Sequence, residues 1–182
     1  MENNSVLFEF SVHDDFGAVE QVVTGCRMAA VPRMNRLVLR HGDHYFGNRN
    51  HIHLWLTWHD YRNANLMILL AYVLLGHPDW ANAEIKIFAA FPHSQVEEEM
   101  AKLVGMIEEG RLPITSKNIE VIPTDDRVDF GRLVAERSET ADLVILGFTD
   151  ARLREKGAEL FQRHPVIQDL LFVSAGEDIF IE

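Results

Sequence analysis

Histidines are the residues in this sequence whose type and spacing could bind a metal ion. His51 and His53 stand two positions apart and would share one face of a strand. Four further candidate ligands lie close to them in the sequence: His41, His44, His59 and Asp60. Histidine and carboxylate ligands suit zinc or iron, but no HExxH or comparable fixed spacing is present. We therefore expect these side chains to be structural and the chain to bind no metal.

Nucleophilic catalysis would need a serine or cysteine that a neighbouring base activates. The sequence contains no Gly-x-Ser-x-Gly motif, and its single cysteine, Cys26, falls in an expected helix with no histidine in register. Cys26 is therefore expected to be a small packed side chain. We expect no catalytic residue and predict that the protein is not an enzyme.

Phosphate binding needs glycines that let backbone amides approach the anion at the start of a helix. The sequence has neither Gly-x-Gly-x-x-Gly nor a Walker loop. Universal stress proteins, in which strands and helices alternate in a similar way, carry Gly-x2-Gly-x9-Gly-Ser/Thr after a late strand. The corresponding stretch here is Gly147 to Asp150, with Asp150 in the place of the second glycine. A carboxylate there would repel phosphate, so we expect no useful binding of ATP.

The elements that would position such residues centre on the longest apolar run, Leu66 to Leu75. Ten residues of helix span about 15 Å, half of the ~30 Å hydrocarbon layer of a bilayer. A secretory signal would stand at the amino terminus behind basic residues, and this run is in mid-sequence. Short apolar segments rich in β-formers flank it at 52–56 and 85–89. Strand, helix and strand form a βαβ unit, so the run is expected to be a core helix that is buried on nearly all sides.

Strands and helices are expected to alternate along the whole chain. The expected strands are 6–12, 37–39, 52–56, 85–89, 119–122, 143–146, 170–173 and 179–181, the last two forming a closing hairpin. The expected helices are 14–29 with Asp14 or Asp15 as its cap, 66–75, 94–109, 126–138, and 150–163 with Asp150 as its cap. This order predicts a single α/β domain over 1–182, universal-stress-protein-like or Rossmann-like, with helices on both faces of an open, mostly parallel sheet. Residues 1–47 would be a βαβ lead-in, and residues 48–182 the main β-α repeat.

Composition excludes several classes of partner. The chain has 182 residues, of which 47% are hydrophobic, and a net charge of −11. That charge argues against nucleic acid and against direct insertion into or docking on an anionic lipid surface. A single cysteine cannot form an internal disulfide, which suits a reducing, cytosolic compartment.

The segment from residue 52 to 88 resembles the carboxy-terminal cytosolic domain of the cation–chloride cotransporters. That family reads Ile-Asp-Val-Trp-Trp, then an acidic pair or His-Asp, then Gly-Gly, an apolar helix with Pro-Tyr or Pro-Phe, a tryptophan, and Ile-Arg-Ile/Val-Phe. The matching residues are Ile52, Trp55, His59, Asp60, Tyr72, Trp80, Ile85, Ile87 and Phe88. Three flanking stretches, at 34–39, 141–146 and 170–176, resemble further landmarks of the family in the same order. The resemblance covers roughly residues 5 to 182.

The sequence also departs from the family. The Gly-Gly falls near Ala64 and Asn65 with three extra residues before it, Ala71 replaces the helix proline, and His53 replaces the aspartate of Ile-Asp-Val. Without the proline, any kink that it imposes should be missing. These departures imply a distant, prokaryotic member or a separately expressed piece.

The resemblance implies a cytosolic regulatory and assembly domain, on the cytoplasmic face of the cell membrane, of a cation-coupled chloride cotransporter-like permease. Such a domain would need no cofactor, would form a homodimer and would contact the transmembrane domain, which is absent from this chain together with its ion-binding residues. An apolar helix needs a partner on its outer side, and the candidate interaction residues are Leu66, Leu69, Tyr72, Val73 and Trp80. Two alternatives remain open: a free-standing universal-stress-like nucleotide-binding protein, and an unrecognised hydrolase or metal protein.

Overall fold

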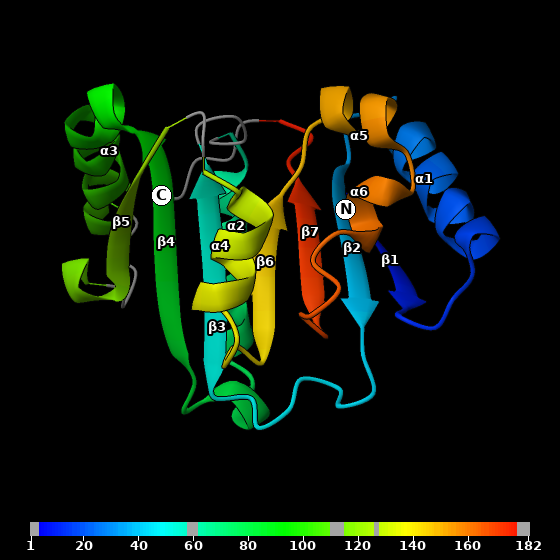
Figure 1. The fold of residues 1–182 in the computed structure, drawn as a ribbon, viewed down its shortest axis with the longest axis horizontal. Coiled ribbons are helices and arrows are strands. Elements are labelled where there is room, and N and C mark those ends of the chain that lie inside the picture. Colours follow the sequence, from blue (N-terminus) through cyan, green and yellow to red (C-terminus); the bar gives the residue numbers. More distant parts are fainter. Residues whose placement is uncertain (1–3, 58–61, 110–114, 126–127, 178–182) are drawn as a thin grey trace.

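The computed structural model describes residues 4–57, 62–109, 115–125 and 128–177. Within them a seven-stranded sheet has the order β1-β2-β7-β6-β3-β4-β5 (Figure 1). The strands are β1 (Ser5–Ser11), β2 (Asn35–His41), β3 (His51–Thr57), β4 (Glu84–Pro92), β5 (Ile119–Thr124), β6 (Leu143–Gly147) and β7 (Leu170–Ser174). Each of them overlaps a strand expected from the sequence.

Strand direction divides the sheet into two parts. Neighbouring strands pair in parallel except β2 and β7, which are antiparallel. The first two strands therefore run opposite to the other five, and the carboxyl ends of β7, β6, β3, β4 and β5 meet at one edge (Figure 1). This arrangement confirms the expected open, mostly parallel α/β sheet.

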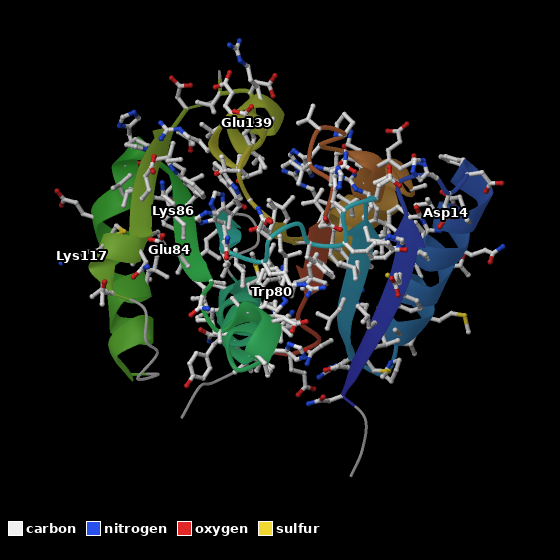
Figure 2. The ribbon with its side chains drawn as sticks, turned by 90° about the horizontal axis from the view of Figure 1, so that it is seen from below. Asp14, Trp80, Glu84, Lys86, Lys117 and Glu139 are labelled. Atoms are coloured by element: carbon white, nitrogen blue, oxygen red, sulfur yellow. The ribbon has the colours of Figure 1, made fainter. Side chains whose placement is uncertain are left out.

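Helices cover both faces of the sheet, as expected. One face packs against α2 (Ala64–Leu75) and α3 (Val96–Glu109). The other packs against α1 (Phe16–Ala30), α4 (Phe130–Arg137), α5 (Asp150–Lys156) and α6 (Glu159–Gln162). Short 3-10 turns occupy Pro78–Trp80, His93–Gln95 and Ser116–Asn118. In Figure 2, α2 with Trp80 beside it lies on one side of the sheet and α4 on the other.

Local side chains determine where several helices begin. Asp15 accepts a hydrogen bond from the Ala18 amide, which confirms the expected cap of α1. The expected cap Asp150 is wrong, because Thr149 accepts from the Arg152 amide and Asp150 is the first residue inside α5.

The helix expected over 150–163 is two helices, α5 and α6. Gly157 separates them, because its φ of 54° lies in the left-handed region and cannot continue a right-handed helix. The helix expected over 126–138 begins at Phe130 after the cap Asp129, and residues 126–127 lie outside the described residues.

The apolar helix α2 is buried on one side rather than on nearly all sides. Met67, Ile68 and Ala71 are fully buried against β3 and β6, while Tyr72 and Val73 are 43% and 61% exposed. The sequence run is apolar around the helix, but a single sheet face covers only one stripe of it.

The carboxy-terminal hairpin expected from the sequence needs a strand at 179–181, which lies outside the described residues. β7 itself is hydrogen-bonded on both edges, in parallel to β6 and antiparallel to β2. It is therefore an interior strand that joins the two parts of the sheet.

Candidate functional site

A pocket of about 420 Å³ opens where β3, β4, β5 and β6 end. Thr57, Pro92, Thr124 and Gly147 stand at the carboxyl ends of these four strands and line it. In open α/β sheets this edge is where ligands bind, especially where the strand order reverses. Here it reverses beside β3, because β4 lies on one side of β3 and β6 on the other.

Aliphatic and aromatic side chains form much of the pocket wall. They come from β6, β7, α6 and the two segments that lead into α4 and α5: Leu146, Phe172, Leu160, Val128, Phe130 and Phe148. Phe148 packs edge-on against Phe161, which packs in the same way against Phe172. The pocket therefore has a packed apolar wall on the α4–α6 side of the sheet.

Two arginines and a carboxylate supply the charges of the pocket. Arg152 is exposed on α5, Arg163 is half-buried just after α6, and Asp125 is exposed after β5. The Nε of Arg163 donates to Nε2 of His164 at 3.1 Å. Among these lining residues the balance is one net positive charge in a chain whose net charge is −11.

A buried arginine on β2, Arg40, fixes the segment that carries Arg163. Its guanidinium donates at 2.6–3.0 Å to four backbone carbonyls, those of Phe161, Arg163, His164 and Ile167. Burial lowers the pKa of Arg40 to about 10, and the nearby Asp169 carboxylate opposes that shift, so the group stays charged at neutral pH. The pocket wall formed by residues 160–163 is thus held by side-chain contacts from the opposite part of the sheet.

A second buried arginine on β2, Arg36, lies behind Phe148. It forms an ion pair with Asp150, donates to the Ser174 hydroxyl at 2.7 Å, and stacks over the Phe148 ring. Arg36 compensates the carboxylate that we expected to repel phosphate, so repulsion by Asp150 is a weaker argument than the sequence suggested. Cys26 is fully buried, which confirms the expected packed side chain, and burial, ahead of the effects of these two charges, raises the pKa of its thiol to about 12.

Three backbone amides near the start of α5 have hydrogen-bond partners within the chain. The Phe148 amide donates to the Val173 carbonyl at 2.9 Å, and the Arg152 amide donates to Thr149 Oγ1 at 3.3 Å. The Leu153 amide donates to the Thr149 carbonyl at 2.9 Å. At this helix start a phosphate group would use the amides of the cap and first turn, those of Thr149, Asp150 and Ala151.

His53 belongs to a buried network rather than to a cluster of ligands. One Ser138 hydroxyl contacts His53 Nδ1 at 3.1 Å and accepts from Trp55 Nε1 at 3.0 Å. Burial, with the Lys86 charge second, lowers the pKa of His53 to about 4, so the ring is neutral at pH 7.

His41, His44 and His51, the other histidines named above that the structure describes, belong to no cluster of three or more candidate ligands. His41 stacks on Tyr45, and His59 and Asp60 lie outside the described residues. In the described part of the chain, no group of three or more His, Cys, Asp or Glu side chains could hold a metal ion. The expectation that the chain binds no metal stays a prediction.

The five candidate interaction residues do not form one surface. Leu66 and Trp80 are each 5% exposed and belong to the core, where Trp80 packs edge-on against Phe46. Leu69 is half-buried, and Tyr72 and Val73 are exposed on the outer side of α2. Of the five candidates, Leu69, Tyr72 and Val73 are therefore the ones that a partner can contact.

Of the comparisons with known proteins, the one with solved structures gives a match. No protein-family model and no curated protein matches the sequence. Among solved structures, the chain is similar to the cytoplasmic domain of a prokaryotic cation chloride cotransporter, with a TM-score of 0.64 and 19% identity. The alignment covers 97% of this chain and 66% of that chain. This likeness establishes the fold. The solved structure comes from the family that the sequence landmarks resemble.

None of the helices in the described residues is long and apolar enough to cross a membrane. α2, which contains the longest apolar run, has 12 residues. The expectation that this run is not a membrane helix is confirmed.

Sequence analysis missed the pocket and both buried arginines. Arg36, Val38 and Arg40 share one face of β2, opposite Leu37 and Leu39. Two charged side chains on one face are typical of an ordinary strand with one exposed face. Arg152 and Arg163 lie eleven positions apart on what reads as the polar face of a helix. The one available signal was the general rule for the carboxyl ends of parallel strands, which does not say which residues gather there.

Proposed function

We propose that this chain is the cytosolic regulatory and assembly domain of a cation–chloride-cotransporter-like membrane transporter. One observation carries the proposal: the sequence landmarks that resemble the family lie in order on β2, β3, α2, β4, β6 and β7. They do so in a fold that is similar, over 97% of this chain, to a cytoplasmic domain of such a transporter. The chain spans 66% of that solved chain. In this proposal, transport is the work of a membrane domain and not of this chain.

In this proposal the domain acts by contact, on the cytoplasmic face of the membrane. Leu69, Tyr72 and Val73 give the outer side of α2 an aliphatic and aromatic surface. Side chains of this kind anchor protein interfaces, and a closed two-fold dimer is the commonest way to cover such a surface. A second copy of the domain is the partner proposed for this side of α2, and the transmembrane domain contacts another surface.

An antibody raised against the recombinant chain tests the proposal in cells that carry the gene. The antibody is expected to detect a membrane-fraction species, either larger than 20.8 kDa or co-purifying with a multi-spanning membrane protein. Deletion of the gene should lower chloride-dependent uptake of rubidium, a potassium tracer. A 20.8 kDa species that stays in the supernatant, with unchanged uptake after deletion, would overturn the proposal.

The pocket at the strand ends favours one alternative, a universal-stress-like nucleotide-binding protein. Its position and its two arginines suit a nucleotide, while the single glycine, Gly147, in the segment 147–150 does not. Thermal unfolding in millimolar ATP with magnesium separates the two functions. We expect no change in the melting temperature, and a rise of several degrees would favour the nucleotide-binding protein.

A further inference from the structure

The pocket at the strand ends is built as a ligand site. Its volume of about 420 Å³ lies within the range of roughly 300–1,000 Å³ typical of small-molecule sites. β3 continues into α2 on one face of the sheet, whereas β6 continues into α5 and α6 on the other. The chain thus departs to opposite faces from these two neighbouring strands. The pocket opens at the carboxyl ends of these strands, which form the upper edge of the sheet in Figure 1.

The wall of this pocket favours a ligand with an apolar body. Phe148 and Phe172 are nearly fully buried, at 2% and 1% exposure, so they support the wall from behind. Phe130, which is half-buried, and Val128, which is 39% exposed, present the apolar surface that a ligand can contact. An aromatic or branched aliphatic group would replace water against this wall and gain the hydrophobic contribution of its buried area.

The charges at the rim favour an anionic head group. Arg163 is held in place by the hydrogen bond that Arg40 donates to the Arg163 carbonyl and by the contact of the Arg163 side chain with His164. The side chain of Arg152 has no hydrogen-bond or ion-pair partner among the described residues. A guanidinium group binds a carboxylate through two parallel hydrogen bonds, so these side chains can hold a compact anion.

The backbone argues for a carboxylate rather than a phosphate chain. A polyphosphate is normally bound at a glycine-rich helix start, whereas the segment 147–150 that leads into α5 has a single glycine, Gly147, and the Arg152 amide already donates to Thr149 Oγ1. Anion recognition at this pocket therefore depends on arginine side chains, which suits a head group with a single charge.

We propose that the pocket binds a small organic carboxylate, with its apolar body on Val128 and Phe130 and its head group at Arg152 and Arg163. This goes beyond the proposed function, which assigns the chain no ligand of its own. Binding by the isolated chain and attachment to a transporter are measured separately, so either can fail without the other.

The test uses 4-phenylbutyrate as the probe, with 4-phenylbutan-1-ol as its uncharged counterpart. Calorimetry gives Kd, and amide chemical shifts locate binding, with the largest shifts expected at Gly147 and Thr149. We expect the acid to bind about tenfold or more tightly than the alcohol, since the alcohol cannot form the charge-assisted hydrogen bonds. Arg152→Gln should raise the Kd of the acid by a similar factor. Arg154→Gln is the matched control, two positions along α5 and outside the pocket lining, and should change Kd less than about twofold.

Val128→Trp gives an independent test, because Val128 lines the pocket and is 39% exposed. A tryptophan there should block the pocket without entering the core, so binding is lost while the melting temperature is kept. Three results would overturn the proposal: no binding of the acid by the unmodified chain, equal binding of acid and alcohol, or equal binding by Arg152→Gln. Displacement of the probe by ATP or inorganic phosphate at lower concentration would show a phosphate site instead.

Discussion

The two faces of the sheet are built from different chemistry. Towards α2 and α3, the central strands present mainly aliphatic side chains, such as Ile52 and Leu54 of β3 and Ile87 of β4. Towards α1, α4, α5 and α6, the same strands present Trp55 and Phe88, whose rings stack 4.5 Å apart.

The aromatic face also buries polar and basic groups. Arg36, Arg40, His53 and His164 are each at most 6% exposed and lie among its rings or between its elements. Buried charges and rings of this kind need several partners in fixed positions, whereas aliphatic side chains need only volume and shape. The aliphatic face therefore stabilises the fold mainly through buried apolar volume, whereas the aromatic face holds backbone segments and side chains in fixed positions. The apolar wall of the pocket lies on the aromatic face.

The largest effect on stability should come from removing the four hydrogen bonds that Arg40 donates on the aromatic face. Arg40→Met removes the donor to four buried carbonyls and leaves Asp169 without its neighbouring charge. We expect a loss of about 3–5 kcal/mol in the free energy of unfolding, measured by urea denaturation at pH 7.5. The exposed Arg154→Met is the control and should stay within about 0.5 kcal/mol. A loss below about 1 kcal/mol for Arg40→Met would mean that the hydrogen bonds of Arg40 are not needed to hold the segment 161–167 in place.

A cavity on the aliphatic face should have a smaller but still substantial effect. Ile68 is fully buried in α2, and Ile68→Ala should cost about 3 kcal/mol through lost contacts and a residual cavity. Val73→Ala, on the exposed side of the same helix, should change stability by less than about 0.5 kcal/mol. Equal losses in the two variants would mean that the outer side of α2 is buried in solution, by a second copy or another partner.

Acid should destabilise the aromatic face through its two buried histidines. Burial first, then Lys86 and His51, lowers the pKa of His53 from 6.5 to about 4, with Asp142 opposing the shift. Burial first, then Arg163 and Arg40, lowers the pKa of His164 to about 4, with the Gly131 backbone and Asp129 opposing it. Both rings are neutral in the folded state, so their contribution is complete above pH 6.5 and is lost as the pH falls towards 4.

Each histidine should remove about 2 kcal/mol of stability between pH 8 and pH 5. Urea denaturation across this range measures the loss, and His53→Gln should reduce its pH dependence by about one proton. His44→Gln, at an exposed position, is the control for the substitution itself and should change the free energy of unfolding at pH 8 by less than about 0.5 kcal/mol. A stability that is flat from pH 8 to pH 5 would contradict the neutral buried state of both rings.

The smallest effect on folding should come from the outer side of α2, where the expected effect is on assembly. Val73→Glu should leave the free energy of unfolding of the monomer within about 0.5 kcal/mol and should weaken a dimer seen by light scattering at tens of micromolar. Val31→Glu, at an 84% exposed position near α1, is the matched control and should leave the dimer intact. A strict monomer for the unmodified chain would contradict the proposed interface.

Local patterns in the sequence were enough for the fold class. The alternation of short apolar segments with helical periodicity located every observed strand, and Asp15 was recognised as a cap because its hydrogen bond joins residues three positions apart. The apolar run at 66–75 was correctly interpreted as a core helix. Which of its residues lie on the exposed side was not foreseen, because periodicity shows which residues are apolar but not how many neighbours surround them.

The sequence by itself determined the elements and their order along the chain, because helix periodicity, strand alternation and caps depend on residues within a few positions of one another. Only the tertiary structure decided that β7 lies between β6 and β2, which it joins in antiparallel pairing. It also decided that Arg40 reaches carbonyls 121 to 127 positions away, and that four strand ends converge on one pocket. These contacts depend on how the packed layers bring distant segments together, and no local pattern of residue types encodes that arrangement.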